Sequence, residues 1–124
     1  MSHRLEPHAG QAYLDPREVA TRLQEEFSCC DIDAEQGMDD AGDMLAKLIE
    51  LKAPQAIIDE VSAGREHSLR VTVADDNASD NYLSFLVRPN NGLLIGYYSA
   101  THERTCRPML ERCATALNYQ ITLV

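Results

Sequence analysis

Alternation of apolar and polar residues is clearest in the middle of the chain, between His67 and Tyr98. Two runs place an apolar residue at every second position: Leu69, Val71, Val73 and Leu83, Phe85, Val87. A period of two is typical of strands with one covered face. Residues 89–92, Pro-Asn-Asn-Gly, then suit a hairpin turn, and residues 93–98 are rich in β formers. We predict an antiparallel meander of three strands.

Apolar residues spaced by three and four predict helices on both sides of the meander. Asp15 and Pro16 are a favoured helix start, because a carboxylate caps free amides and proline fits the first turn. The first predicted helix covers about 16–27, and the second runs from Met38 to about Leu51. A third follows Pro54 and ends at Gly64. The last predicted helix carries the stripe Cys106, Leu110, Cys113 and Leu117.

Two further runs with period two predict strands outside the meander. Residues 28–33 read as a short edge strand whose acids discourage further pairing, and residues 119–124 read as a closing strand. The order strand, helix, strand at the end of the chain favours a parallel crossover. The fold class is therefore α+β, with a mixed, mainly antiparallel four- to five-stranded sheet and helices packed on one face. We expect residues 1–14 to be a partly ordered N-terminal arm and residues 15–124 to be a single domain.

Composition narrows the classes of protein. The chain has 124 residues, of which 44% are hydrophobic, which is enough for one compact core without disulfides or metal. A formal net charge of −9 opposes binding to nucleic acid, and no apolar run is long enough to span a membrane or direct secretion. We expect a cytoplasmic protein with reduced cysteines. The four histidines and four cysteines lack metal-ligand spacing, so we predict no metal and no cofactor.

Acidic residues crowd into one short part of the chain, between Glu25 and Asp43. They are Glu25, Glu26, Asp31, Asp33, Glu35, Asp39, Asp40 and Asp43. One interpretation is a surface that binds a basic protein partner, and the other is an acidic face that only interacts with solvent.

Two features suggest other protein contacts. Tyr82, Tyr97 and Tyr98 lie in the predicted meander, and tyrosine is common in interface anchors, although cross-strand tyrosine pairs also stabilise sheets. The closing strand, if it lies at an edge, can pair with its counterpart in a second subunit. Both features predict a homodimer, through the tyrosine-bearing face or through the edge strand.

The connection from the meander into the last helix is the best-placed candidate for a ligand. Ser99, Thr101, His102 and Arg104 lie there, and free amides at a helix start attract a phosphate or carboxylate. The same residues also suit a simple helix cap and a hydrated surface, since no glycine-rich loop is present. Cys106 and Arg112 have the spacing of a phosphatase loop, but Pro108 and Glu111 oppose phosphate binding there, so a packed thiol is the better interpretation.

No catalytic motif emerges from these patterns. We predict a small, acidic, non-catalytic protein-interaction module, with a regulator or inhibitor of a basic partner as its most concrete form. The alternative is a small-molecule anion-binding protein or enzyme with its site at residues 99–104.

Overall fold

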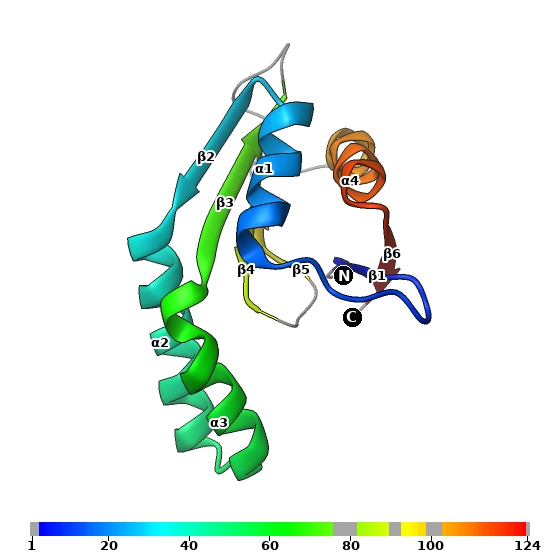
Figure 1. Ribbon diagram of the computed structural model, residues 1–124. Helices are drawn as coiled ribbons and strands as arrows, with labels where there is room; N and C mark the ends of the chain where they lie inside the picture. The colour runs from blue at the N-terminus through cyan, green and yellow to red at the C-terminus, as the bar shows by residue number, and fades with distance from the viewer. Residues whose placement is uncertain (1–2, 76–81, 90–92, 99–102, 124) are drawn as a thin grey trace.

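The structure, a computed structural model, describes residues 3–75, 82–89, 93–98 and 103–123. The described chain is an α+β protein with one sheet and helices before, between and after its strands (Figure 1). The elements are β1 (His3–Pro7), α1 (Pro16–Glu26), β2 (Cys29–Asp33), α2 (Ala34–Glu50), α3 (Gln55–Gly64), the 3-10 helix η1 (Arg65–His67), β3 (Leu69–Ala74), β4 (Tyr82–Val87), β5 (Leu93–Tyr98), α4 (Glu103–Leu117) and β6 (Tyr119–Leu123). The predicted fold class is confirmed.

The described strands form a six-stranded sheet in the order β2-β3-β4-β5-β1-β6. The predicted meander is confirmed as β3, β4 and β5, which pair in antiparallel fashion, and β2 is an edge strand as expected. The register shifts between Ser84 and Phe85, so that Ser84 is paired with Tyr97 while Phe85 is paired with Ile95. Such a bulge bends a strand and increases its twist.

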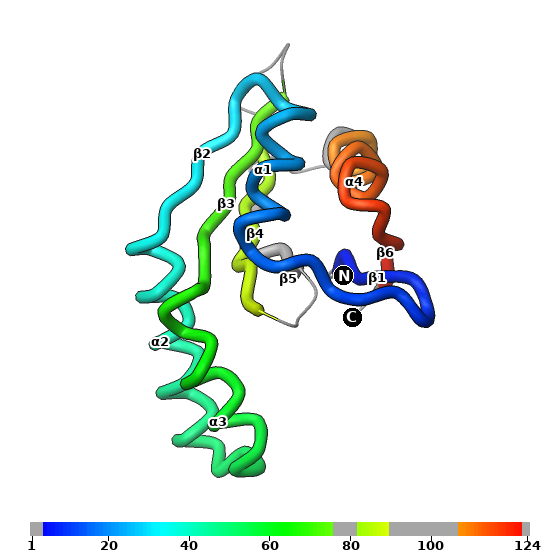
Figure 2. Tube along the Cα trace, in the orientation of Figure 1, coloured from blue at the N-terminus to red at the C-terminus, as the bar shows by residue number. Residues whose placement is uncertain are grey.

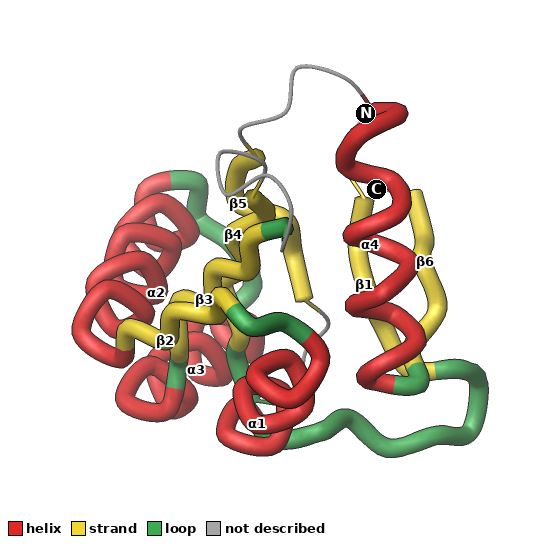
Figure 3. The backbone as a smooth tube through the Cα atoms, turned by 90° about the horizontal axis from the view of Figure 1, so that it is seen from above, coloured by secondary structure: helices red, strands yellow, loops and turns green. Residues whose placement is uncertain are grey.

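The N-terminal residues differ from the prediction of a partly ordered arm, since His3–Pro7 form β1. This strand lies between β5 and β6 and pairs with both in antiparallel fashion. Figure 3 shows β1 and β6 side by side, with α4 running along them. The predicted parallel pairing of β5 with β6 is therefore wrong, because β1 separates them. All pairings between described strands are antiparallel, and the sheet has one strand more than expected.

The main core lies between one face of the sheet and helices α1 and α4. From the sheet it receives the alternating apolar residues of β3 and β4, with Phe85 fully buried. From the helices it receives Val19, Leu23, Phe27, Met109, Leu110, Cys113 and Leu117. Burying a side chain of the size of Leu or Phe contributes about 1.5–3 kcal/mol, so this layer accounts for most of the fold's stabilisation.

Local signals explain where the helices begin. The Asp15 carboxylate accepts a hydrogen bond from the Arg17 amide at 2.7 Å, and Pro16 occupies the first turn of α1, as predicted. The second helix begins at Ala34 and not at Met38. Its N-cap is Asp33, whose carboxylate accepts from the Gln36 amide at 2.9 Å. Asp33 thus ends one strand and starts the next helix, so no loop is needed between them.

Helices α2 and α3 form a hairpin that extends beyond the ends of β2 and β3 (Figures 1 and 2). Its root contacts the sheet closely, because a Cβ added at Gly37 would lie 2.5 Å from Leu69 Cα. Arg70, on the face of β3 opposite the core, forms an ion pair with Asp40 of α2 at 2.6 Å. Helices α1 and α4 therefore cover one face, whereas α2 contacts the reverse face. The prediction that the helices pack on one face holds for α1 and α4 and is wrong for α2.

Candidate functional site

The predicted ligand segment falls mostly outside the described residues. Ser99, Thr101 and His102 lie in the gap before α4, and Arg104 is known only as a backbone position in the first turn of that helix. Anion binding at residues 99–104 therefore stays a prediction.

The phosphatase-like spacing of Cys106 and Arg112 does not form a phosphate loop. Both residues lie within the continuous helix α4. Arg112 instead contacts the end of α1, where its Nε donates to the Glu26 carboxylate at 3.0 Å and its guanidinium lies 4.3 Å from the centroid of the Phe27 ring. This arginine therefore joins two helices.

The acidic residues of the predicted cluster divide between two roles. Glu26 is used in the pair with Arg112, and Asp40 is half-buried in its pair with Arg70. A hydrogen bond connects the Arg70 guanidinium to Ser84 at 3.5 Å, and the Ser84 hydroxyl lies 3.1 Å from that of Thr72. Asp40 therefore helps to fix α2 to the sheet.

The other acids face solvent on a continuous part of the chain. Asp31 and Asp33 are exposed on the edge strand β2, and Glu25 is exposed at the end of α1. On α2, Glu35, Asp39 and Asp43 are exposed and spaced by four residues, which places them on one side of a helix. Within the described part of the chain, these three carboxylates form no ion pair. We call Glu35, Asp39 and Asp43 the acidic stripe.

The α2–α3 hairpin also carries exposed apolar residues, which the sequence patterns did not lead us to expect at the surface. The exposed fractions are 56% for Ile49, 69% for Leu51 and 44% for Ile57. All three lie near the turn between α2 and α3, and we call them the hydrophobic tip. The sequence signal was present, because the pairs Leu48-Ile49 and Ile57-Ile58 supply more apolar residues than a single contact between two helices covers.

The predicted tyrosine surface is described only in part. Tyr82 is half-buried on β4. Tyr97 and Tyr98 lie in β5 as the Cα partners of Ser84 and Leu83. A tyrosine-bearing contact surface stays a prediction.

Two cysteine thiols are poorly suited to nucleophilic chemistry. Burial, together with the neighbouring Asp31 carboxylate, raises the pKa of Cys30 to about 11. Burial in the core also raises the pKa of Cys113 far above its ordinary value. Both thiols therefore stay protonated at neutral pH. Because the thiolate is the reactive form, neither side chain is a good nucleophile. They act here as packing residues of the core. The packed thiol predicted for Cys106 stays a prediction.

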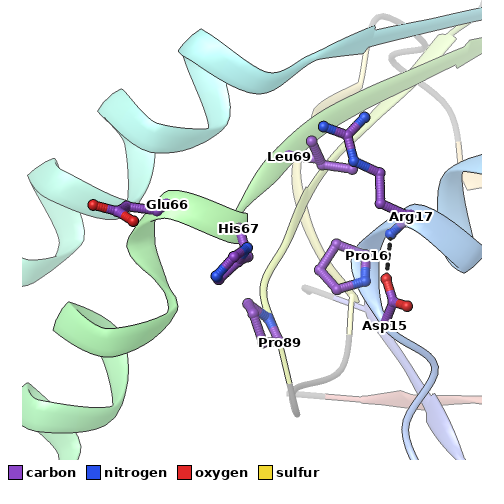
Figure 4. Close-up of a pocket in the computed structure, with 7 residues that line it drawn as sticks. All are labelled: Asp15, Pro16, Arg17, Glu66, His67, Leu69 and Pro89. Carbon is purple, nitrogen blue, oxygen red and sulfur yellow. Dashed lines mark hydrogen bonds between the residues drawn. The ribbon is translucent and has the colours of Figure 1, made fainter.

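The structure contains a pocket of about 350 Å³ between the start of α1 and η1 (Figure 4). Its lining residues are Asp15, Pro16, Arg17, Glu66, His67, Leu69 and Pro89. The Asp15 carboxylate already caps α1, and Figure 4 shows Glu66 pointing away from the start of that helix. The polar groups do not converge on one point, as those of a built ligand site do. We assign no ligand to this pocket.

Metal ligands, membrane-spanning helices and similarity to known proteins also bear on function. Among the described residues, no three His, Cys, Asp or Glu side chains are grouped so that they could hold a metal ion. No helix within the described ranges is long and apolar enough to span a membrane. Comparison with protein-family models, curated proteins and solved structures yielded no match to this chain.

Proposed function

We propose that this chain is a non-catalytic protein-interaction module that binds a basic partner through the acidic surface formed by β2 and α2. The observation that carries the proposal is the acidic stripe. Glu35, Asp39 and Asp43 are exposed and form no ion pair among the described residues, whereas Asp40 of the same helix is used internally.

The stripe has an energetic cost that a partner would remove. Like charges four residues apart on a helix are destabilising by about 0.2–0.5 kcal/mol per pair. Glu35 offsets part of this cost near the positive end of the helix, but Asp39 and Asp43 lie beyond the first turn. Lysine or arginine side chains of a partner would convert the repulsion into attraction. A module that acts in this way regulates or inhibits by occupying the basic surface of its partner.

The proposal is tested by affinity capture from a lysate of the source organism, with washes at low and high salt. We expect a basic protein to be retained at low salt and released at high salt, since exposed charge pairs are screened. The variant Glu35→Gln/Asp39→Asn/Asp43→Asn should lose this protein. A control variant, Glu18→Gln/Glu66→Gln/Glu111→Gln, removes the same number of exposed charges elsewhere and should retain it. Equal retention by both variants would contradict the proposal.

We also propose self-association through β6, which occupies the second edge of the sheet. The strand Tyr119–Leu123 carries no charged residue, whereas the opposite edge strand β2 carries Asp31 and Asp33. Edge strands without charges are prone to pairing, and two antiparallel copies of β6 would continue the sheet across a twofold axis. Analytical ultracentrifugation should show a dimer that the edge substitution Thr122→Lys converts to a monomer. A wild-type monomer at high micromolar concentration would exclude this pairing.

A further inference from the structure

We infer that the hydrophobic tip is a docking surface for an amphipathic helix that carries basic residues. This inference rests on the proposed function and specifies the kind of basic partner. It adds an apolar contact to the electrostatic one.

Burial along the α2–α3 hairpin decreases with distance from the sheet. At the root, Gly37, Ala41 and Val61 are buried. Midway, Met44 and Leu45 of α2 are half-buried. At the turn the hydrophobic tip is open to solvent, while the neighbouring Leu48 and Ile58 are half-buried. Two helices that carry wide apolar stripes leave part of each stripe open unless a third layer covers it, and near the sheet that layer is β3. At the tip, no other described element does so.

The charge of the hairpin distinguishes between possible occupants. Residues 34–64 contain seven acidic residues and two lysines, and because Asp40 is paired with Arg70 the hairpin keeps a net charge of −4. A second copy of the hairpin would therefore bring like charges together on contact. A partner with lysine and arginine beside its apolar face would neutralise them, so charge complementarity favours a basic partner over self-association at this surface.

The shape of the surface favours a helical segment. An amphipathic helix can present apolar residues at i, i+3, i+4 and i+7 to exposed apolar side chains on a helical pair, while its basic residues face the acids on either side. Asp43, the stripe residue nearest the turn, is six residues from Ile49 on α2, which is about 9 Å along the helix axis. A bound helical segment of a few turns is long enough to contact both.

The probe that we choose is a synthetic 21-residue peptide of leucine and lysine with leucines at the a and d positions. The comparison peptide has the same composition in scrambled order. Binding is followed by fluorescence anisotropy at low and high salt with the full chain. We expect the patterned peptide to bind more tightly than the scrambled one and to keep part of its affinity at high salt, because apolar contacts are not screened.

The deciding variant is Ile49→Ser/Leu51→Ser/Ile57→Ser, which leaves the net charge unchanged. We expect it to bind the patterned peptide roughly tenfold or more weakly, since three apolar contacts are lost. The matched control is Tyr13→Ser, because Tyr13 is 44% exposed on a different part of the surface and should leave affinity unchanged. Circular dichroism should show the same melting temperature for all variants, as none of these side chains is buried.

Each alternative outcome has a distinct meaning. Equal affinity of the serine variant and wild type, with salt-dependent binding retained, would overturn the docking inference and leave the acidic-surface proposal intact. Absence of binding to either peptide at low salt would overturn both. A dimer in ultracentrifugation that the serine substitutions dissociate would show that a second copy covers the tip, and would overturn the assignment of a basic partner.

Discussion

Replacement of Gly37 by alanine tests whether the α2–α3 hairpin is fixed to the sheet by close backbone contact. A Cβ at this position would lie 2.5 Å from Leu69 Cα, 2.5 Å from the Ser68 carbonyl oxygen and 2.7 Å from the Leu69 carbonyl carbon. All three atoms are backbone, so none can move by a change of rotamer. The helix must shift away from β3 to accept the methyl group.

The magnitude follows from two opposing terms. Overpacking of a tight contact costs about 1–3 kcal/mol and occasionally more. Alanine in place of glycine within a helix gains at most about 1 kcal/mol. Because three backbone atoms are approached too closely, we expect the upper part of the first range and a net loss of about 2 kcal/mol in the free energy of unfolding.

Gly42 on the same helix is a matched control. A Cβ there would meet the Arg65 guanidinium, with its nearest nitrogen at 2.7 Å. Arg65 is an exposed side chain whose Nε donates to the Met38 carbonyl at 3.1 Å, and it can move into solvent. We expect Gly42→Ala to change stability by less than about 0.5 kcal/mol, since helix propensity offsets the loss of this one surface hydrogen bond.

Urea denaturation of wild type, Gly37→Ala and Gly42→Ala measures the difference directly. Equal stability of the two variants would refute the argument, because both gain the same methyl group on the same helix. A stabilised Gly37→Ala would show that α2 does not approach β3 as closely as described.

Three further predictions concern other contacts. Arg70→Ala should lower the free energy of unfolding by about 2–3 kcal/mol, since it leaves the Asp40 carboxylate half-buried without its ion pair. A double-mutant cycle with Asp40→Ala should show coupling between the two residues, and additive losses of stability would contradict the pairing. The rate of Cys30 alkylation, measured by mass spectrometry, should rise with pH to a midpoint of about 11, because the thiolate is the reactive form, and Asp31→Asn should lower that midpoint. A wild-type midpoint at the ordinary thiol pKa would contradict the burial of this side chain. Tyr119→Phe should lower the free energy of unfolding by about 1 kcal/mol, since the Tyr119 hydroxyl accepts a hydrogen bond at 2.8 Å from the Leu14 backbone amide in the loop before α1. Thermal unfolding measures this change, and an unchanged melting temperature would show that the bond does not stabilise the fold.

The elements that the sequence predicted are those whose signals are local. The alternation of β3 and β4, the Asp15-Pro16 start of α1 and the break at Pro54 each depend on neighbours within a few residues. These predictions are confirmed. The start of α2 was placed too late because Asp33 serves two elements at once, and its capping role is visible only when the helix behind it is known.

The strand β1 was not predicted, for a different reason. His3–Pro7 contains a proline and two charged or titratable residues besides Arg4, and it has no alternating pattern that stands out locally. It becomes a strand because β5 and β6 provide backbone partners on both sides. A strand that depends on distant partners in this way leaves little trace in its own residues.

The candidate surfaces also divide into features that depend on local sequence and features that depend on distant contacts. The acidic cluster was visible as composition, but which acids are used internally depended on where Arg70 and Arg112 lie. The hydrophobic tip was not predicted, because periodicity shows that one side of a helix is apolar and does not show whether another element covers it.

The position of β1 has a consequence for the order of folding. Its register joins His3 with Leu123, residues at opposite ends of the described chain, so its docking closes a loop of nearly the whole sequence. Contacts of such long separation form slowly, because the entropy of loop closure is lost before the contact repays it. We expect the β2–β5 sheet and its helices to form first and β1 to join last. Before β1 docks, the edges of β5 and β6 that it will cover are open. Strands of a second molecule can pair with these edges, so intermolecular strand exchange competes with correct folding at this stage.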